Sequence, residues 1–378
     1  MSPVSRAKDD RPPVEFIDEV EPSRAQRHER VPRFGRQRRV VLGAGAAVAL
    51  VAIWALLAKN DDHRSPSIAE ARGELLGYVG DVTQADGYRY DAVDDRGHGL
   101  AGAKIIRLAE TGEFAAVYFW SDDEAEGFTT SLATSTDLLD WTWRVDLSSD
   151  GSQPTIKEAS DGGYVVAWEV GVTDDIHVRL NYYPTLEVLL AGMPAKVFDA
   201  ERQLPGCAEG TPNLYSASST RVDFGLHFFR DCRTDTQARG TTDWVTWNAV
   251  EQPLLDRAAY LQGYAGSIGD RDVVEFRGYE FTFLEAQFTQ NDWGTFRVLV
   301  YDEGTGAADR RSYPEFAAEP PSVHVSIRTH GRSSSFSNMT VGQVGLDGRQ
   351  VVVVSVYIQQ GAEGEEGPLI YYRTVEDP

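Results

Sequence analysis

Residues 160–168 read Ser-Asp-Gly-Gly-Tyr-Val-Val-Ala-Trp, a tight polar turn followed at once by a strongly apolar run. Turn residues of this kind favour hairpins, and short runs rich in Val and aromatic residues favour buried strands. The chain repeats this combination, each time after a more weakly apolar strand. We expect five such hairpins, centred on residues 110–112, 160–163, 218–220, 277–278 and 347–348.

A second turn also repeats. Residues 135–141 and 241–247 share the form Ser/Thr-x-Asp-x-x-x-Trp and follow the third strand of two of the units. A unit that recurs along the chain in this way indicates one supersecondary element used several times. Five four-stranded units predict an all-β fold, a five-bladed β-propeller. A two-sheet sandwich is the alternative, but a sandwich does not need the same turn chemistry at regular intervals.

The N-terminal region differs from the rest of the 378-residue chain, whose net charge is −22. Residues 40–58 form a run of 19 residues without a charge. As a helix this run would span roughly 28 Å, close to the thickness of a bilayer core. Four arginines immediately before it predict a cytoplasmic N-terminus, and therefore a C-terminal region on the outer side of the cell membrane.

The predicted organisation has four parts. Residues 1–39 are expected to be a disordered cytoplasmic tail, residues 40–58 a single transmembrane helix, residues 59–76 a juxtamembrane stalk, and residues 77–378 the propeller. A cleavable signal peptide is the alternative for the apolar run, although Leu56 is a poor residue near a cleavage site. Both alternatives place the large domain outside the cytoplasm.

The acidic charge and the missing motifs exclude several functions. A nucleic-acid partner would require a basic face, so none is expected. The sequence contains no Gly-rich phosphate loop, no nucleophile elbow and no characteristic spacing of metal ligands. We therefore expect no cofactor and no metal site.

Cys207 and Cys232 lie at equal distances from the centre of the predicted turn Ser218–Arg221. Residues in such positions face each other across an antiparallel hairpin, within reach of a disulfide. A compartment outside the cytoplasm permits this bond, so we expect the two cysteines to be bonded. A catalytic thiol is disfavoured because the sequence places no histidine beside either cysteine.

Residues 85–375 resemble the five-bladed glycoside hydrolases of families 43 and 32, which include arabinanases, arabinofuranosidases and β-xylosidases. The resemblance depends on the number of blades, on the turn at 135–141, and on Cys207-Ala-Glu-Gly-Thr-Pro212 at the start of the third unit. It implies three carboxylates in a central funnel, one from each of the first three blades. Glu209 matches the acid of the third blade.

The chain departs from this family at the other two positions. Gln153-Pro154 stands where the family has Asp-Pro, and the corresponding place in the first unit falls at Gly102-Ala103. Glutamine can neither accept the proton of an attacking water nor act through charge on a neighbouring acid. A diverged glycosidase would use Glu209 as its acid and another carboxylate as its base, with three candidates: Asp94, Asp95 and Glu169.

Other polar and aromatic residues are expected at the mouth of the propeller, where the second strands of the blades end. Gln153, His98, Arg230 and Glu285 are candidates for substrate binding. Trp120 and Trp168 could stack on sugar rings.

These observations predict a membrane-anchored propeller that acts on or binds a glycan at its mouth. It would be either a diverged glycosidase or a non-catalytic glycan-binding module. The alternative is a protein–protein interaction propeller of a cell-envelope complex, which needs no catalytic site.

Overall fold

The computed structural model describes residues 65–121, 127–171, 176–230, 232, 234–305 and 322–376. The predicted cytoplasmic tail and the predicted transmembrane helix lie outside these residues. None of the helices within the described residues is long and apolar enough to cross a membrane.

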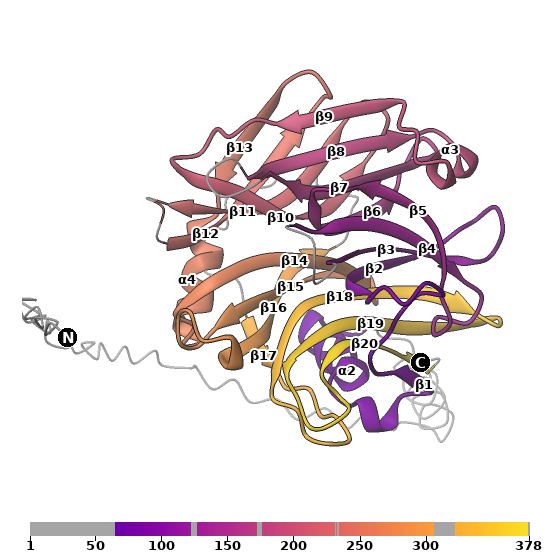
Figure 1. Cartoon of the computed structure of the whole chain (residues 1–378). Coiled ribbons are helices and arrows are strands. Elements are labelled where there is room, and N and C mark those ends of the chain that lie inside the picture. The colour runs from indigo at the N-terminus through magenta and orange to yellow at the C-terminus, as the bar shows by residue number, and fades with distance from the viewer. Residues whose placement is uncertain are drawn as a thin grey trace, which may run out of the picture. The chain divides into compact units, whose positions relative to one another are not determined.

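The described chain forms five antiparallel sheets of four strands each, as an all-β five-bladed propeller requires (Figure 1). Blade 1 contains β2 (Ala101–Arg107), β3 (Phe114–Trp120), β4 (Thr129–Ser135) and β5 (Thr142–Ser148). Blade 2 contains β6 (Gly151–Glu158), β7 (Tyr164–Val170), β8 (His177–Tyr183) and β9 (Lys196–Ala200). Blade 3 contains β10 (Gly206–Ala217), β11 (Val222–Arg230), β12 (Thr234–Thr242) and β13 (Trp247–Glu251).

The last two blades complete the ring. Blade 4 contains β14 (Gly266–Phe276), β15 (Tyr279–Gln287), β16 (Phe296–Thr305) and β17 (Ser322–Val325). Blade 5 contains β18 (Ser335–Leu346), β19 (Arg349–Gln360) and β20 (Gly367–Thr374), and its outer strand is β1 (Gly87–Arg89) from the N-terminal side. The inner strands β2, β6, β10, β14 and β18 contact one another in that order, and β18 returns to β2. Because β1 pairs with β20, the two ends of the repeat are held in one sheet.

All five predicted hairpins are confirmed, and each connects the first strand of a blade to the second. The predicted disulfide is also present: Cys207 and Cys232 are bonded, with their Cα atoms 5.1 Å apart. The two predicted Ser/Thr-x-Asp turns have matching hydrogen bonds. The carboxylate of Asp137 accepts from the backbone of Leu139 and Asp140, and that of Asp243 accepts from Val245 and Thr246.

Each inner strand contains a β-bulge near its first residues, at the end of the blade opposite the hairpin. In blade 2, for example, Ser152 pairs with Glu169 and Thr155 with Ala167, so three steps on β6 match two on β7. The first bulged residue always has a left-handed backbone, with φ between 47° and 57°. These residues are Gly102, Gln153, Thr211, Ser267 and Asn338.

Within the described residues, three short α-helices lie outside the sheets: α2 (Ile68–Val79), α3 (Leu186–Leu190) and α4 (Pro253–Leu261). Two 3₁₀ turns accompany them, at Val82–Gln84 and Trp293–Thr295. Helix α2 begins with a capping box, in which Ser67 and Glu70 each satisfy the backbone N–H of the other. Helix α4 connects blade 3 to blade 4.

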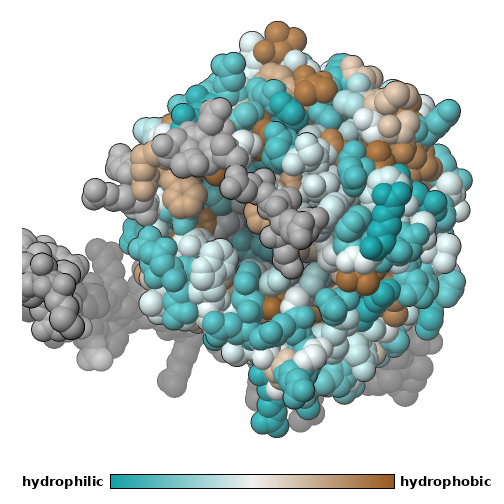
Figure 2. Space-filling model, viewed as in Figure 1, coloured by the Kyte–Doolittle hydropathy of each residue, from teal (hydrophilic) through white to brown (hydrophobic). Residues whose placement is uncertain are grey.

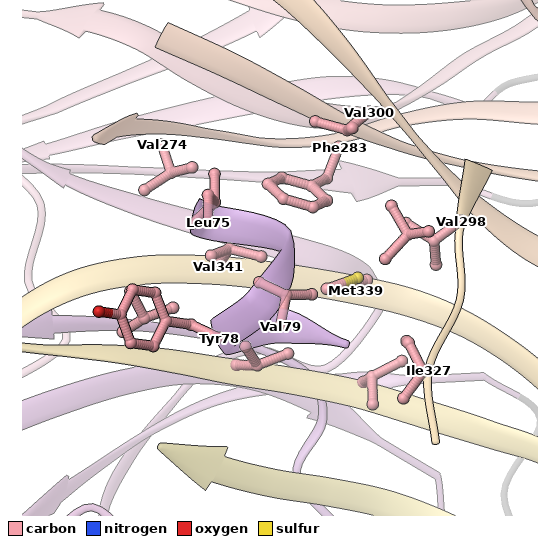
Figure 3. Close-up of a cluster of buried hydrophobic side chains, with 14 of the residues drawn as sticks. Leu75, Tyr78, Val79, Val274, Phe283, Val298, Val300, Ile327, Met339 and Val341 are labelled. Carbon is pink, nitrogen blue, oxygen red and sulfur yellow. The ribbon is translucent and has the colours of Figure 1, made fainter. Parts of the chain in front are cut away.

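Helix α2 packs against blades 4 and 5 (Figure 3). Leu75 and Val79 are fully buried in the apolar cluster that contains Phe283 and Val341. The folded unit therefore begins at Ser65 and not at residue 77, and the second half of the predicted stalk belongs to the core. The reason is that the helix covers apolar side chains that the two blades leave exposed between them.

Three further apolar clusters lie between blades 5 and 1, blades 1 and 2, and blades 2 and 3, and a fourth lies between helix α4 and blade 4. On the face shown in Figure 2, hydrophobic residues are dispersed among hydrophilic ones.

At the centre, Lys104 of blade 1 forms an ion pair with Asp272 of blade 4, with Nζ–O distances of 2.7 and 2.6 Å. This pair joins two inner strands that are not neighbours in the ring.

Candidate functional site

A cavity of about 620 Å³ opens at the bulged end of the blades, and residues of all five blades line it. The ends of the second strands meet there, as expected from the sequence. They contribute Trp120, Glu169, Phe229, Glu285 and Gln359. The cavity is therefore the place where the predicted polar groups of different blades come together.

The bulges bring a ring of residues to this cavity, and four of the five bulged residues line it: Gln153, Thr211, Ser267 and Asn338. Gln153 occupies the position that the sequence suggested for blade 2. In blade 3 the equivalent residue is Thr211, because it has the same backbone conformation and also precedes a proline. None of the five bulge positions carries a carboxylate.

Glu209 is consequently two residues away from the position assigned to it by the resemblance. Its side chain is 1% exposed and is not part of the cavity wall. Oε1 accepts hydrogen bonds from the backbone N–H groups of Gln203 and Leu204, at 2.9 and 2.7 Å. Burial raises the pKa of Glu209, although these two hydrogen bonds oppose the shift. The carboxyl fixes the 201–206 connection to blade 3.

Carboxylates at the cavity bind the bulges of neighbouring blades. Glu169 of blade 2 accepts a hydrogen bond from the backbone N–H of Thr211 in blade 3, at 3.1 Å. Glu285 of blade 4 accepts one from the backbone N–H of Asn338 in blade 5. Both acids line the cavity, so they combine an inter-blade contact with a position at the site.

Asp235 is a third cavity acid, which the sequence analysis missed. It lies at the start of β12, pairs with Phe229 at the end of β11, and is 4% exposed. Burial raises the pKa of Asp235 to about 7; hydrogen bonds from the backbone of Ile268 and Ser267 oppose this rise, and the charge of Glu285 adds to it. Asp235 was not predicted because only the ends of second strands were expected at the mouth. In an antiparallel sheet the third strand begins beside the end of the second strand, so its first residues also reach the mouth.

Asp94 and Asp95, the other candidate bases, do not line the cavity. The buried carboxylate of Asp94 accepts from the backbone of Arg96 and His98, from the ring of His98 and from the hydroxyl of Tyr118. Although burial raises the pKa of Asp94, these hydrogen bonds outweigh it and the pKa is lowered. The exposed Asp95 accepts from the backbone of Trp143 at 2.8 Å. Asp94 therefore holds the turn of residues 93–99 together, and Asp95 connects this turn to β5.

His98 reaches the site through Trp120. The two rings are stacked, with centroids 3.8 Å apart and planes inclined by 6°. The indole N–H of Trp120 donates to Ser131 at 2.9 Å, so both the plane and the edge of the ring are fixed. Trp120 lines the cavity whereas His98 does not, and the histidine therefore positions the tryptophan.

Two predicted binding residues lie elsewhere. Trp168 is 1% exposed and packs in the core between blades 1 and 2, because alternate side chains of a strand point to opposite faces and Glu169 takes the cavity side. Arg230 forms an ion pair with Glu251 on the outer strand of blade 3 and is not part of the cavity wall. Neither residue lines the cavity.

Several aromatic residues that the sequence analysis did not select do line the cavity. They come from blades 1, 4 and 5: Phe119, Phe128, Trp293, Phe296 and Tyr357. Trp293 is 61% exposed, and Phe128 is 46% exposed. Within the described residues no group of His, Cys, Asp and Glu side chains has the arrangement of a metal site.

Comparison with solved structures finds similar chains among arabinan-degrading enzymes. An exo-1,5-α-L-arabinanase from a bovine ruminal metagenomic library is 13% identical, with 77% of this chain and 96% of that chain covered and a TM-score of 0.49. A family 43 endo-arabinanase from Bacillus licheniformis is 10% identical, with 77% of this chain and 98% of that chain covered and a TM-score of 0.48. An α-L-arabinofuranosidase from Fusarium graminearum is 12% identical, with 78% of this chain and 86% of that chain covered and a TM-score of 0.43.

No family model matches the sequence, and no curated protein matches it. The function proposed below therefore depends on the cavity itself.

Proposed function

We propose that this propeller binds a glycan in the cavity at its bulged end, as the extracytoplasmic part of a membrane-anchored protein. The observation that supports this proposal best is the combination of exposed aromatic rings with convergent amide and carboxyl groups in a cavity of about 620 Å³. Sugars present hydroxyl groups at their edges and C–H groups on their faces, so a site for them needs both kinds of partner.

The aromatic residues supply surfaces for the sugar faces. Trp120 is fixed by His98 and Ser131, and a ring that is already ordered loses little entropy when a ligand stacks on it. Trp293 lies on the other side of the ring of blades, before β16, and is largely exposed. A glycan between blades 1 and 4 would contact both.

The polar groups supply hydrogen bonds to hydroxyls. Gln153 lines the cavity, and its Oε1 is buried without a hydrogen-bond partner among the described residues. A buried acceptor that lacks a partner is costly, so a ligand hydroxyl that donates to it would be favoured. Asn338 and Gln359 offer further amide groups at the cavity.

Membrane anchoring is the second part of the proposal and is supported by the uncharged run at 40–58. Within the described unit, the chain enters beside the β14–β15 hairpin, where the hydroxyl of Tyr279 donates to the carbonyl of Pro66 at 2.9 Å. This hairpin is at the opposite end of blade 4 from the cavity.

The test measures sugar binding by the full-length protein through its tryptophan fluorescence. Arabinobiose, xylobiose and galactobiose would be titrated into wild type, Trp293→Ala and Gln153→Ala. We expect one of the sugars to bind. Each substitution should lower the affinity for that sugar by about tenfold, which corresponds to the loss of one contact of about 1.4 kcal/mol. Trp143→Ala is the matched control because Trp143 lies on the outer strand of blade 1, away from the cavity.

Absence of binding to all three sugars would count against the proposal. So would binding that Trp293→Ala and Gln153→Ala leave unchanged, since the sugar would then occupy another site.

A further inference from the structure

Acidic side chains outnumber basic ones in the wall of the cavity. Three carboxyl groups line it, those of Glu169, Asp235 and Glu285. Within the described part of the chain, the wall contains no lysine or arginine, and His227 is its one side chain that could become positively charged. The charge of the wall therefore favours a neutral or positively charged ligand over an anion.

Two of the acids are placed by the same segment of β14. Asp235 of blade 3 accepts hydrogen bonds from the backbone of Ser267 and Ile268 in blade 4. The next residue, Gly269, pairs with Glu285, and a Cβ atom placed on it would lie 3.5 Å from Glu285 Oε1. The carboxyl groups of blades 3 and 4 are thus neighbours across residues 267–269.

Glu169 reaches the same side of the cavity from blade 2. Its Oε2 accepts from the backbone of Thr211 at 3.1 Å, and a Cβ atom on Gly210 would collide with this oxygen. Gly210 pairs with His227, whose Nδ1 would lie 3.6 Å from a Cβ atom on Gly269. His227 is therefore adjacent both to Glu169 and to the segment that places the other two acids.

Most aromatic rings of the cavity belong to a different set of blades. The acids come from blades 2, 3 and 4, whereas six of the rings come from blades 4, 5 and 1: Trp293, Phe296, Tyr357, Phe119, Trp120 and Phe128. A sugar whose face stacks on these rings would turn one of its edges toward the carboxyl groups. The substituents on that edge decide how well the sugar fits.

Asp235 also has a buried acceptor atom that calls for a donor. The residue is 4% exposed and lines the cavity, and its Oδ1 has no hydrogen-bond partner among the described residues. A buried acceptor without a partner is costly, so a ligand group that donates to it is favoured. A sugar hydroxyl could donate, but an ammonium group has three donors, forms charge-assisted hydrogen bonds, and also offsets the charge of the acids.

We propose that the glycan bound in this cavity carries a protonated amino group, as an amino sugar does, and that this group donates to Oδ1 of Asp235. The inference rests on the proposed function. Glu285 and Glu169 contribute through their charges, which act beyond hydrogen-bond distance. Burial raises the pKa of Asp235, and a positive charge beside the carboxyl lowers that pKa again, so the ligand favours the ionised form that binds it.

The test compares three disaccharides with the same linkage: the β-1,4-linked dimer of glucosamine, cellobiose, and N,N′-diacetylchitobiose. At the same carbon of each ring they carry an ammonium, a hydroxyl and an acetamide group. Binding to the full-length protein would be followed by tryptophan fluorescence at about pH 6.5, below the usual pKa of an amine. We expect the glucosamine dimer to bind about tenfold more tightly than the other two, with an affinity that falls as salt is added.

Substitutions of the acids test the charge itself. Asp235→Asn removes the charge with little change of shape, and it should lower the affinity for the glucosamine dimer about tenfold more than the affinity for cellobiose. Glu285→Gln should change this ratio in the same direction. Asp223→Asn is the matched control, because Asp223 is a buried acid at the hairpin end of blade 3, outside the cavity wall, and it should leave the ratio unchanged.

The outcomes separate this inference from the proposed function. Equal affinities for the three disaccharides would overturn the amino-sugar assignment, and so would a preference that Asp235→Asn and Glu285→Gln leave unchanged. Binding of neutral sugars without binding of the glucosamine dimer would overturn it too, while the binding function would remain. Absence of binding to these disaccharides and to the neutral sugars tested above would reject both.

Discussion

The left-handed residue of each bulge determines what an inner strand presents to the cavity. A residue other than glycine in this conformation costs roughly 1–3 kcal/mol, so it persists only where its surroundings fix it. Thr211 and Asn338 are fixed in this way, because carboxylates of the preceding blades accept hydrogen bonds from their backbone N–H groups. The same contacts bring Glu169 and Glu285 to the site.

Glu365 shows how strongly one buried carboxylate can organise a loop. It is 5% exposed and accepts hydrogen bonds of 2.6 Å from Thr329, Gly331 and Ser333, all in the connection before β18. Burial raises the pKa of Glu365, but these bonds outweigh it and lower the pKa from 4.5 to about 2. The carboxylate is therefore stabilising only while it is ionised.

We predict that Glu365→Gln lowers the free energy of unfolding by about 1–3 kcal/mol at pH 6, because the amide cannot accept all three hydrogen bonds. Since the folded pKa lies below the unfolded value, the stabilisation is complete above pH 4.5 and is lost as the pH falls toward about 2. Urea denaturation at a series of pH values would measure this. The exposed Glu363→Gln is the control, and an equal effect in both variants would contradict the prediction.

At the scale of elements, helix α2 completes the core between blades 4 and 5. Ion pairs from Arg72 to Asp302 and from Glu74 to Arg277 hold the middle of the helix against blade 4. The hydroxyl of Tyr371 donates to the carbonyl of Val79 at the end of the helix. The helix is thus an integral part of the propeller.

We predict that Leu75→Ala lowers the free energy of unfolding by about 2–5 kcal/mol, because the truncated side chain leaves a cavity in a fully buried cluster. Thermal or urea denaturation would measure the change. Leu261→Ala, on helix α4 and 69% exposed, should change the stability little. A Leu75→Ala protein as stable as the control would mean that α2 is a detachable stalk.

At the scale of the whole propeller, the Lys104–Asp272 pair connects blades 1 and 4 through the centre. The side chain of Asp272 is 2% exposed, and it also accepts from the backbone of Val341 in blade 5 at 2.7 Å. Lys104 Nζ donates to the carbonyl of Val341 at 3.0 Å. One ion pair therefore links three of the five blades.

We predict that Lys104→Met lowers the free energy of unfolding by about 3–5 kcal/mol, because it leaves Asp272 charged and buried without its partner. The double variant Lys104→Met/Asp272→Leu should recover part of this loss in the same denaturation experiment. Asp140→Asn, which removes the exposed partner of Arg89, is expected to cost less than about 1 kcal/mol. Equal stabilities of the two single variants would contradict the prediction.

The sequence was sufficient for the features that depend on neighbours along the chain. The five hairpins were predictable because turn residues and apolar strands are local signals, and the number of blades follows from their repetition. The disulfide was predictable because two residues equidistant from a turn must face each other. Trp120, Glu169 and Glu285 line the cavity because second strands end there, and Gln153 lines it through the bulge of β6.

Only the tertiary structure decided which acids share the cavity. A bulge shifts the side chains that follow it, so counting from a motif placed Glu209 at a position that Thr211 occupies. Asp235 was missed because its place depends on pairing with Phe229 and on the bulge of the next blade. Burial of Trp168 likewise depends on the neighbouring blade. Short-range chemistry thus determined the blades of this protein, whereas contacts between blades determined its candidate site.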